Sequence, residues 1–212
     1  MATGQRHAEP VSIAVFARAP VPGRCKTRLI PTLGADGAAH LQRLMIERTI
    51  ACALVAGVGP VSLWCTPDAA HPVFAGLGRD APLQLCVQAD GDLGARMLAA
   101  FEVQKNSPLL LIGTDCPALT TGHLQACADV LRDGHDAVFL PTEDGGYVLV
   151  GLRTPQPILF EAMPWSTDKV MAETRRRLQR AGLAWREPAM LWDVDTPADL
   201  ERLRASGLMD LS

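Results

Sequence analysis

The 212-residue sequence lacks an excess of charge of either sign, with 20 lysines and arginines against 23 aspartates and glutamates. The basic residues are dispersed, and the short cluster Arg175–Arg177 is typical of a solvated helix face, so nucleic-acid binding has little electrostatic support. No apolar run is long enough to cross a bilayer, and Met1–Pro10 lacks the apolar core of a signal peptide. We therefore expect a cytoplasmic protein with no membrane span and no nucleic-acid partner.

Paired cysteine motifs and low-complexity linkers are also missing. The six cysteines show no C-x-x-C spacing, and several lie inside apolar runs, which favours buried thiols in a reducing compartment over disulfides or zinc. Hydrophobic residues make up 48% of the chain and charged residues 20%, which is the balance of a globular protein with a substantial core. Because no linker divides the chain, we expect a single domain over residues 1–212.

The stretch that organises the rest is Leu109–Ile112, four consecutive aliphatic residues followed by Gly-Thr-Asp. Such a run suits a strand that is buried on both faces of a parallel sheet. Open α/β sheets bind ligands beyond the carboxyl ends of their strands. Asp115 is therefore expected at the edge where a hard cation such as Mg²⁺ would bind together with substrate phosphates. The alternative is that Asp115 only caps a turn.

A basic loop follows the first predicted strand, Val11–Ala17. Residues 18–28 contain two prolines, one glycine and four cations. Gly23 lets backbone amides approach an anion, while Arg24 and Lys26 offer a planar fork and a point charge for phosphate oxygens. The spacing is not that of a Walker A loop, because Gly23 is not followed directly by Lys26. The loop thus indicates a nucleotide-phosphate site, and the alternative is an ordinary cation-rich surface loop.

Apolar spacing predicts that strands and helices alternate along the rest of the chain, which indicates repeated βαβ units. Further strands are expected at residues 61–65, 83–87, 136–141 and 147–150. Helices are expected at residues 36–55, 72–77, 97–101 and 121–131.

A glycine-containing turn precedes the helical run at 97–101. Gly91 and Gly94 flank Asp92, a plausible N-cap, and they would let a base or ribose lie against the backbone. Arg96 would then face the nucleotide. The alternative is a plain capped helix start with Arg96 in solvent.

The acidic turn Thr142–Gly146 joins two predicted strands, and its Asp-Gly pair is in itself a hairpin signal. If this turn lies at the same sheet edge as Asp115, Glu143 or Asp144 would orient an acceptor hydroxyl or act as a general base. Trp165–Thr167 is expected to start the next helix, whose free amides would form an anion site. Plain capping by a hydroxyl of that segment is the alternative.

The segment near the carboxyl terminus carries a helix-start signal and two further carboxylates. Thr196 as N-cap, Pro197 at the first helical position and Asp199 at the third account for three residues without a functional role. Asp193 and Asp195 are left unexplained, and in an extended chain both point to one side. We expect one of them to be the second metal ligand.

Six motifs in order carry a resemblance to a known family. They are residues 17–29, 91–97, 112–117, 143–147, 165–167 and 193–200. Over roughly residues 11–203 the chain resembles bacterial glycosyltransferase-like proteins, often labelled arsenosugar-biosynthesis-associated glycosyltransferases. Their wider superfamily is the nucleotide-diphospho-sugar transferases with the glycosyltransferase A fold. Proteins related to this superfamily include nucleotidyltransferases. The chain departs from the D-x-D motif of many glycosyltransferases, which favours the nucleotidyltransferase-like branch.

The resemblance implies an α/β fold, a three-layer α/β/α sandwich with a mixed, mainly parallel sheet. It also implies a nucleotide-binding half over residues 11–117 and an acceptor half over residues 118–205. The implied activity is a Mg²⁺- or Mn²⁺-dependent transferase that uses a nucleotide or nucleotide-sugar donor and an unknown small-molecule acceptor. A non-catalytic nucleotide-sugar-binding protein is the alternative.

The resemblance also implies a role for particular residues. The implied catalytic residues are Asp115, Asp144 and Lys26, and the implied metal ligands are Asp115 and Asp195. The implied nucleotide-binding residues are Ala17, Arg18, Ala19, Gly23, Arg24, Lys26, Gly91, Gly94 and Arg96. The implied acceptor-binding residues are Glu143, Gly145, Gly146, Tyr147, Trp165, Ser166 and Thr167.

Overall fold

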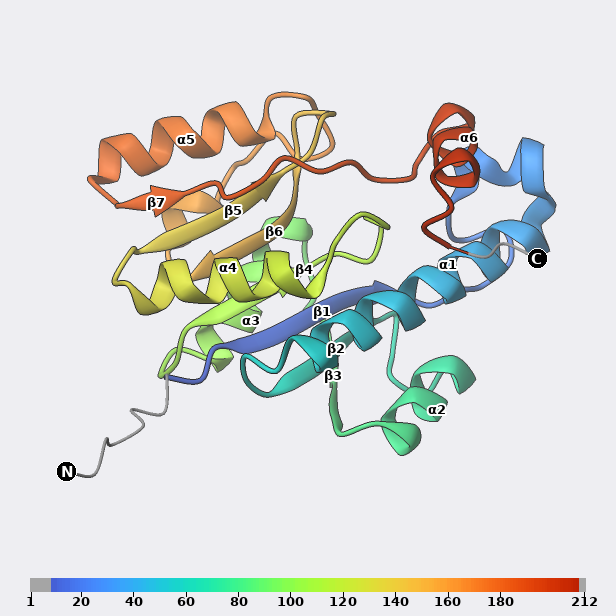
Figure 1. The fold of residues 1–212 in the computed structure, drawn as a ribbon, viewed down its shortest axis with the longest axis horizontal. Coiled ribbons are helices and arrows are strands. Elements are labelled where there is room, and N and C mark those ends of the chain that lie inside the picture. Colours follow the sequence, from blue (N-terminus) through green and yellow to red (C-terminus); the bar gives the residue numbers. More distant parts are fainter. Residues whose placement is uncertain (1–8, 210–212) are drawn as a thin grey trace.

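A computed structural model describes residues 9–209 and shows one seven-stranded sheet in the order β3-β2-β1-β4-β6-β5-β7 (Figure 1). The strands are β1 (Ser12–Arg18), β2 (Val61–Thr66), β3 (Leu83–Val87), β4 (Leu109–Ile112), β5 (Ala137–Pro141), β6 (Tyr147–Leu152) and β7 (Trp185–Arg186). The first four strands run parallel to one another, whereas β6 is antiparallel to both β4 and β5. The sheet is therefore mixed and mainly parallel, as predicted.

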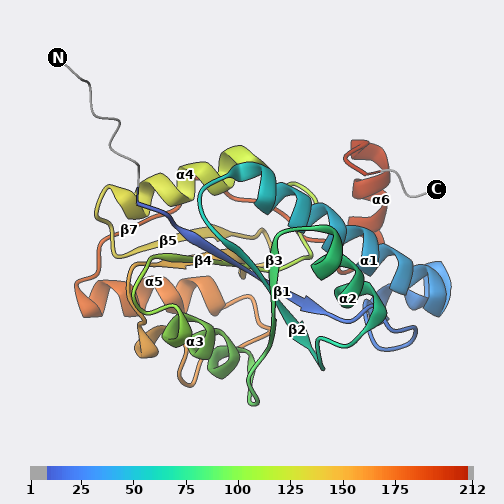
Figure 2. The ribbon, with the colours of Figure 1, turned by 90° about the horizontal axis from the view of Figure 1, so that it is seen from below.

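Helices cover both faces of this sheet (Figures 1 and 2). They are α1 (Ile30–Ala56), α2 (Pro72–Asp80), α3 (Leu93–Val103), α4 (Thr121–Arg132), α5 (Val170–Ala181) and α6 (Pro197–Ser206), with short 3-10 turns η1 (Thr27–Leu29) and η2 (Pro157–Leu159). Buried residues of α1, α2 and α4 pack on one face, and those of α3 and α5 pack on the other. The predicted three-layer α/β/α architecture is confirmed.

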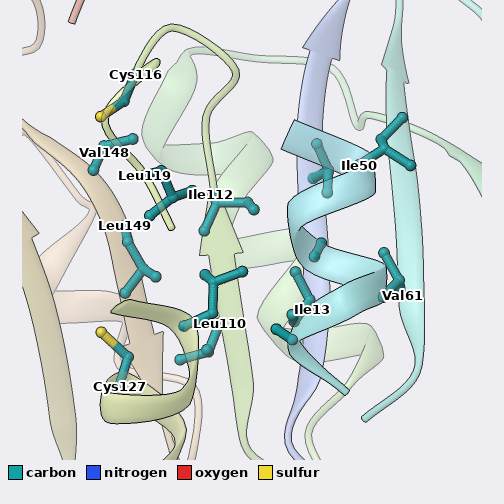
Figure 3. Packing of buried hydrophobic residues seen from close by; sticks show 14 of the residues in the cluster. Ile13, Ile50, Val61, Leu110, Ile112, Cys116, Leu119, Cys127, Val148 and Leu149 are labelled. Atoms are coloured by element: carbon teal, nitrogen blue, oxygen red, sulfur yellow. The ribbon is translucent and has the colours of Figure 1, made fainter. Parts of the chain in front are cut away.

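The core explains why β4 is the centre of the fold. All four of its residues are buried, and they alternate between the two hydrophobic clusters on either side of the sheet. Leu110 and Ile112 lie on the face of the sheet that α1 and α4 cover, in the same cluster as Ile50 and Cys127 (Figure 3). Burial on both faces is the reason that this strand reads as an unbroken aliphatic run.

Helix α3 begins at Leu93, directly after the plausible N-cap Asp92 and ahead of the predicted run at 97–101. Helices α1 and α5 also begin elsewhere than predicted. Helix α5 begins at Val170 and not at Trp165, because Ser166 has φ of 63° and the Thr167 hydroxyl accepts the Lys169 N–H. Helix α1 begins at Ile30, ahead of the predicted residue 36, and it contains a kink at Gly34 with φ of 71°. In both cases a residue with positive φ lies where the helical periodicity is interrupted.

Helix α6 packs away from the main layers, against the start of α1 (Figure 1). Its Leu200 and Leu203 form a third cluster with Leu29, Met45 and Val194. This cluster brings the carboxyl-terminal segment onto the basic loop of residues 18–28. Within the described residues no helix is long and apolar enough to span a membrane, and all six cysteines are free.

Candidate active site at the carboxyl ends of β1 and β4

The loop after β4 is held rigidly at the sheet edge. The Gly113 N–H donates to the Val148 carbonyl of β6 at 3.0 Å, and the Gln42 amide of α1 donates to the buried Thr114 hydroxyl at 3.3 Å. The backbone carbonyl of Asp115 accepts the Val194 N–H at 2.9 Å. Asp115 is thus fixed between β4 and the carboxyl-terminal segment, with its side chain about half exposed.

Lys26 reaches this position from the basic loop. Its backbone lies in the left-handed region with φ of 46°, and only 2% of its side chain is exposed. Its Nζ lies 2.5 Å from Asp115 Oδ1, 2.6 Å from the Val194 carbonyl oxygen and 3.7 Å from Asp195 Oδ1. Three residues proposed from the sequence, Lys26, Asp115 and Asp195, therefore meet although the chain separates them widely.

The segment around Asp195 has the alternating geometry that the sequence predicts. Val194 is fully buried, while Asp193 and Asp195 both line the same cavity. The predicted capping box of α6 is present, and Asp199 Oδ2 accepts the Thr196 N–H at 2.7 Å and the Asp195 N–H at 3.2 Å. The cap that starts α6 therefore also holds the backbone of Asp195.

Several carboxylates lie close together around Asp195, and this shifts the pKa values of two of them. Burial, together with the charges of Asp144 and Asp195, raises the pKa of Asp193 to about 6. Burial also raises the pKa of Asp195, while Lys26 opposes that shift. Each shift means that the ionised form is disfavoured, so an added cation would stabilise the cluster. In the sequence, Asp193 was indicated by its position two residues before Asp195, which puts both side chains on one side of an extended chain.

A cavity of about 600 Å³ opens next to these carboxylates. Its charged lining residues are Lys26, Arg28, Asp115, Asp144, Asp168, Asp193 and Asp195. Its apolar and aromatic lining residues are Phe16, Leu93, Met97, Leu111, Tyr147, Val148, Val150, Trp165 and Val170. A cavity of this size that combines an apolar wall with a few converging polar groups is typical of a small-molecule site.

The predicted hairpin turn places Asp144 in the cavity. Asp144 Oδ1 accepts the Thr142 hydroxyl at 2.5 Å and the Gly146 N–H at 3.0 Å, which fixes the carboxylate. Gly145 has φ of 90°, and its carbonyl accepts the Met171 N–H of α5 at 2.8 Å. Gly145 does not line the cavity and instead joins the turn to α5.

Glu143 is directed away from the cavity. Its two carboxylate oxygens accept hydrogen bonds from Arg202 at 2.7 and 3.0 Å, and the guanidinium of Arg202 stacks on Trp192. The Arg202 guanidinium lowers the pKa of Glu143. Of the two carboxylates in the turn, Asp144 is therefore the one that lines the site, while Glu143 connects the turn to α6.

Most of the other predicted acceptor residues do line the cavity. They are Gly146, Tyr147, Trp165, Ser166 and Thr167. The amides at the start of α5 are largely engaged, because the Met171 and Lys169 N–H groups donate to Gly145 and Thr167. The start of α5 therefore leaves few free amides for an anion, and its N-cap residue, Lys169, has no side-chain capping hydrogen bond.

The other predicted nucleotide-binding residues lie outside the cavity lining. They are Ala17, Arg18, Ala19, Gly23, Arg24, Gly91, Gly94 and Arg96. Arg96 hydrogen-bonds to Gln88 at 3.2 Å, and Gln88 in turn donates to the Trp64 carbonyl of β2 at 2.9 Å. This places the second loop near the carboxyl ends of β1 and β2. Gly94 is required for packing, because a Cβ there would lie within 2.9 Å of the Trp165 indole nitrogen.

The donor set fits a hard dication that also binds substrate oxygens. Within residues 9–209 no group of three or more His, Cys, Asp or Glu side chains is arranged to hold a metal ion by itself. Asp115 and Asp195 nevertheless direct oxygens at one cationic position, which Lys26 Nζ contacts. Mg²⁺ is commonly held by one or two carboxylates, with waters and substrate phosphates completing the shell.

Comparisons with known proteins agree with this architecture. A family described as "Uncharacterized protein conserved in bacteria (DUF2064)" matches residues 49–167. Phosphoenolpyruvate guanylyltransferase of Rubrobacter xylanophilus is 30% identical over 205 residues, which cover 92% of this chain and 96% of that protein.

Solved structures show the same fold. A protein of Desulfovibrio desulfuricans G20 that is assigned to the nucleotide-diphospho-sugar transferases superposes with a TM-score of 0.84 at 28% identity, covering 92% of this chain and 87% of that chain. A nucleotidyl transferase of Methanothermobacter, at 15% identity, superposes with a TM-score of 0.61 over 92% of this chain and 97% of its own. The chain therefore belongs to the bacterial DUF2064 family, and it is a transferase with the nucleotide-diphospho-sugar transferase fold.

Proposed function

We propose that the protein transfers a nucleotidyl group from a nucleoside triphosphate to a hydroxyl of a small-molecule acceptor, with Mg²⁺ or Mn²⁺ as cofactor. The observation that carries the proposal is the convergence of Asp115 and Asp195 on one cationic position at the carboxyl edge of β4. The relation to a guanylyltransferase at 30% identity supports nucleotidyl transfer. The lone aspartate of the Thr-Asp-Cys segment, where many glycosyltransferases have D-x-D, supports it as well.

The chemistry assigned to the site is displacement at phosphorus. The acceptor oxygen forms a bond to the α-phosphorus, the bond from that phosphorus to the bridging oxygen breaks, and pyrophosphate leaves. Asp144, held by Thr142 and Gly146, accepts the proton of the acceptor hydroxyl. A cation on Asp115 and Asp195 would neutralise charge that develops on the phosphates.

The basic loop would hold the phosphates of the donor. Arg18 and Arg24 are exposed at the sheet edge and have the planar fork that suits phosphate oxygens. Lys26 adds a buried positive charge at the metal position. The loop around Gly91 and Arg96 would contact the base or ribose.

The second candidate is glycosyl transfer from a nucleotide-diphospho-sugar, as in the arsenosugar-associated glycosyltransferases that the six motifs resemble. It is favoured by the 28% identity and high structural similarity to the Desulfovibrio protein. The two candidate functions differ in the donor: one uses a nucleoside triphosphate, and the other uses a nucleotide-diphospho-sugar. A non-catalytic binder would take either donor without turnover.

Thermal melting with a panel of nucleoside triphosphates and nucleotide sugars, each with Mg²⁺ or with chelator, tests the proposal. We expect stabilisation by a triphosphate that requires the metal, about 2.7 kcal/mol at a hundredfold excess over Kd. Release of pyrophosphate would then separate a transferase from a binder. A response to nucleotide sugars alone would favour glycosyl transfer, and stabilisation that is indifferent to metal would contradict the proposed site.

Asp115→Asn is the matching variant, since the change is isosteric at an exposed sheet edge. We expect it to keep its fold and to lose the metal-dependent response. Asp129→Asn on α4, where Asp129 pairs with Arg132 at the surface, is the control and should respond like the wild type. If Asp115→Asn unfolds the protein, Asp115 has a structural role.

A further inference from the structure

Apolar side chains make up a large part of the cavity lining. Phe16 of β1, Leu111 of β4 and Val150 of β6 line it from three neighbouring strands, and Leu93 and Met97 of α3 line it together with Trp165. Leu93 is 38% exposed although it is a large hydrophobic residue. Burying such surface against a ligand is worth roughly 25 cal/mol per Å² of apolar area. This wall therefore favours a ligand with an apolar body.

Cations are scarce around the same cavity. Among the described residues that line it, the only Lys or Arg side chains are Lys26 and Arg28, against five aspartates. Lys26 is already engaged by Asp115 and the Val194 carbonyl. The positive charge of a metal ion bound here would be offset by the carboxylates that hold it and by the phosphates of the donor. An anionic acceptor would thus enter a site whose fixed charges repel it.

The amino-terminal end of α5 offers no positive charge that would compensate for an anionic acceptor. The Met171 N–H of α5 donates to the Gly145 carbonyl at 2.8 Å, and the Lys169 N–H donates to the Thr167 hydroxyl at 3.3 Å. The hydroxyl-bearing residues Tyr147, Ser166 and Thr167 also line the cavity, although the Thr167 hydroxyl already donates to the Pro164 carbonyl at 2.7 Å. Such groups bind neutral hydroxyl-bearing compounds well and carry no charge to balance an acid.

We infer that the acceptor is a neutral hydroxyl compound with an apolar body, and that it is not a phosphorylated carboxylic acid. This inference rests on the proposed function for the identity of the site, and it deepens that proposal by naming the class of acceptor. The inferred acceptor also differs from phosphoenolpyruvate, the compound that the name of the Rubrobacter relative specifies.

The test uses a neutral fluorescent probe, N-phenyl-1-naphthylamine, whose emission rises in apolar sites. It is titrated into the full-length protein, and phosphoenolpyruvate with GTP and Mg²⁺ is then added as a competitor. We expect the probe to bind, and we expect phosphoenolpyruvate to displace it no better than inorganic phosphate does. Displacement by phosphoenolpyruvate at lower concentrations than by inorganic phosphate would overturn the inference.

Two variants of the same helix show whether the probe reports on this cavity. Leu93→Arg adds a cation to the apolar wall and should weaken probe binding by about tenfold, equivalent to 1.4 kcal/mol. Val103→Arg, at the far end of α3 and 68% exposed, should leave it unchanged. Equal affinity in both variants would contradict an apolar acceptor site at Leu93.

Failure of the proposed function gives a different result. In that case no triphosphate stabilises the protein with Mg²⁺, while the probe still binds and still responds to Leu93→Arg. If a triphosphate does bind but the probe does not, the nucleotide site stands and the neutral acceptor is wrong.

Discussion

Lys26 is a buried cation in the middle of a cluster of acids, and this position explains how the carboxylates tolerate one another. Its ammonium contacts Asp115 and the Val194 carbonyl and lies 3.7 Å from Asp195. Two carboxylates this close would repel each other in the absence of a cation. Lys26 offsets that repulsion, because it already supplies a positive charge between Asp115 and Asp195.

Lys26→Met should therefore expose the repulsion. Removing the ammonium leaves two half-exposed carboxylates without their shared cation, and we expect the protein to lose about 1–2 kcal/mol of unfolding free energy at neutral pH and low salt. Mg²⁺ should restore more stability in the variant than in the wild type, since it can take the vacated position. Thermal melting with chelator and with Mg²⁺ measures both effects.

Arg24→Met is the control, because Arg24 is an exposed cation on the same loop. It should melt like the wild type under both conditions. An equal response to Mg²⁺ in Lys26→Met and in the wild type would argue against a common cation position.

At the scale of elements, the turn between β5 and β6 connects the site to α5. Gly145 has positive φ, and an added Cβ would collide with the backbone of Asp168. The same turn holds Asp144 toward the cavity and Glu143 toward Arg202 of α6. One turn therefore sets the positions of a catalytic candidate and of two helices.

Gly145→Ala should be more destabilising than a change at an ordinary left-handed glycine. Gly134 provides the matched control, because its φ is 94° and a Cβ there would meet nothing within 4 Å. We expect Gly134→Ala to cost about 1–2 kcal/mol from backbone conformation alone. Gly145→Ala should cost about 2–4 kcal/mol, since overpacking adds to it. Equal losses in urea denaturation would mean that the contact with Asp168 relaxes freely.

The ion pair between α5 and the segment after β7 gives a pH-dependent contribution. Arg175 donates to both oxygens of Glu187, and this interaction lowers the pKa of Glu187 below its usual 4.5. A lowered folded-state pKa stabilises the protein above the unfolded value, and the contribution is lost as the pH falls through the folded one.

Glu187→Gln should accordingly destabilise the protein by about 0.5–1 kcal/mol at pH 7, because the pair is partly exposed. The difference from the wild type should shrink progressively below pH 4.5. Urea denaturation at pH 7 and at about pH 3.5 measures the change. A difference that is the same at both pH values would mean that packing, and not charge, is what the substitution removes.

At the scale of the whole molecule, one sheet runs through both predicted halves. β4 of the first half pairs with β6 of the second, and one hydrophobic cluster contains Val15, Leu110 and Val138 from β1, β4 and β5. The predicted single domain remains a prediction, and continuity of the core is the physical reason for it.

Cysteine accessibility tests that prediction without any mutation. Cys65 of β2 and Cys127 of α4 are both fully buried and belong to opposite halves. In a single cooperative unit both thiols become reactive at the same urea concentration, since all-or-none unfolding exposes them together. Residue-resolved thiol labelling across a urea series would show two midpoints if the halves unfold separately.

The sequence by itself determined the features that depend on local interactions. β3 and β4 lie at the predicted residues, because strand periodicity and burial are written into neighbouring side chains. The cap of α6 formed as predicted, since Thr196 and Asp199 satisfy amides within the first turn. Extended geometry also predicted that Asp193 and Asp195 would share one side.

The tertiary structure alone decided which of these groups meet. Nothing local to the chain indicates that Lys26 would hydrogen-bond to a carbonyl 168 residues away, that β6 would lie antiparallel beside β4, or that Arg202 would draw Glu143 out of the site. Such contacts depend on the packing of distant elements, above all of α6 on α1. Motifs therefore pointed to Lys26, Asp115 and Asp195 as members of one candidate site, but the charge balance of this site arose only when the fold placed one buried ammonium among the carboxylates.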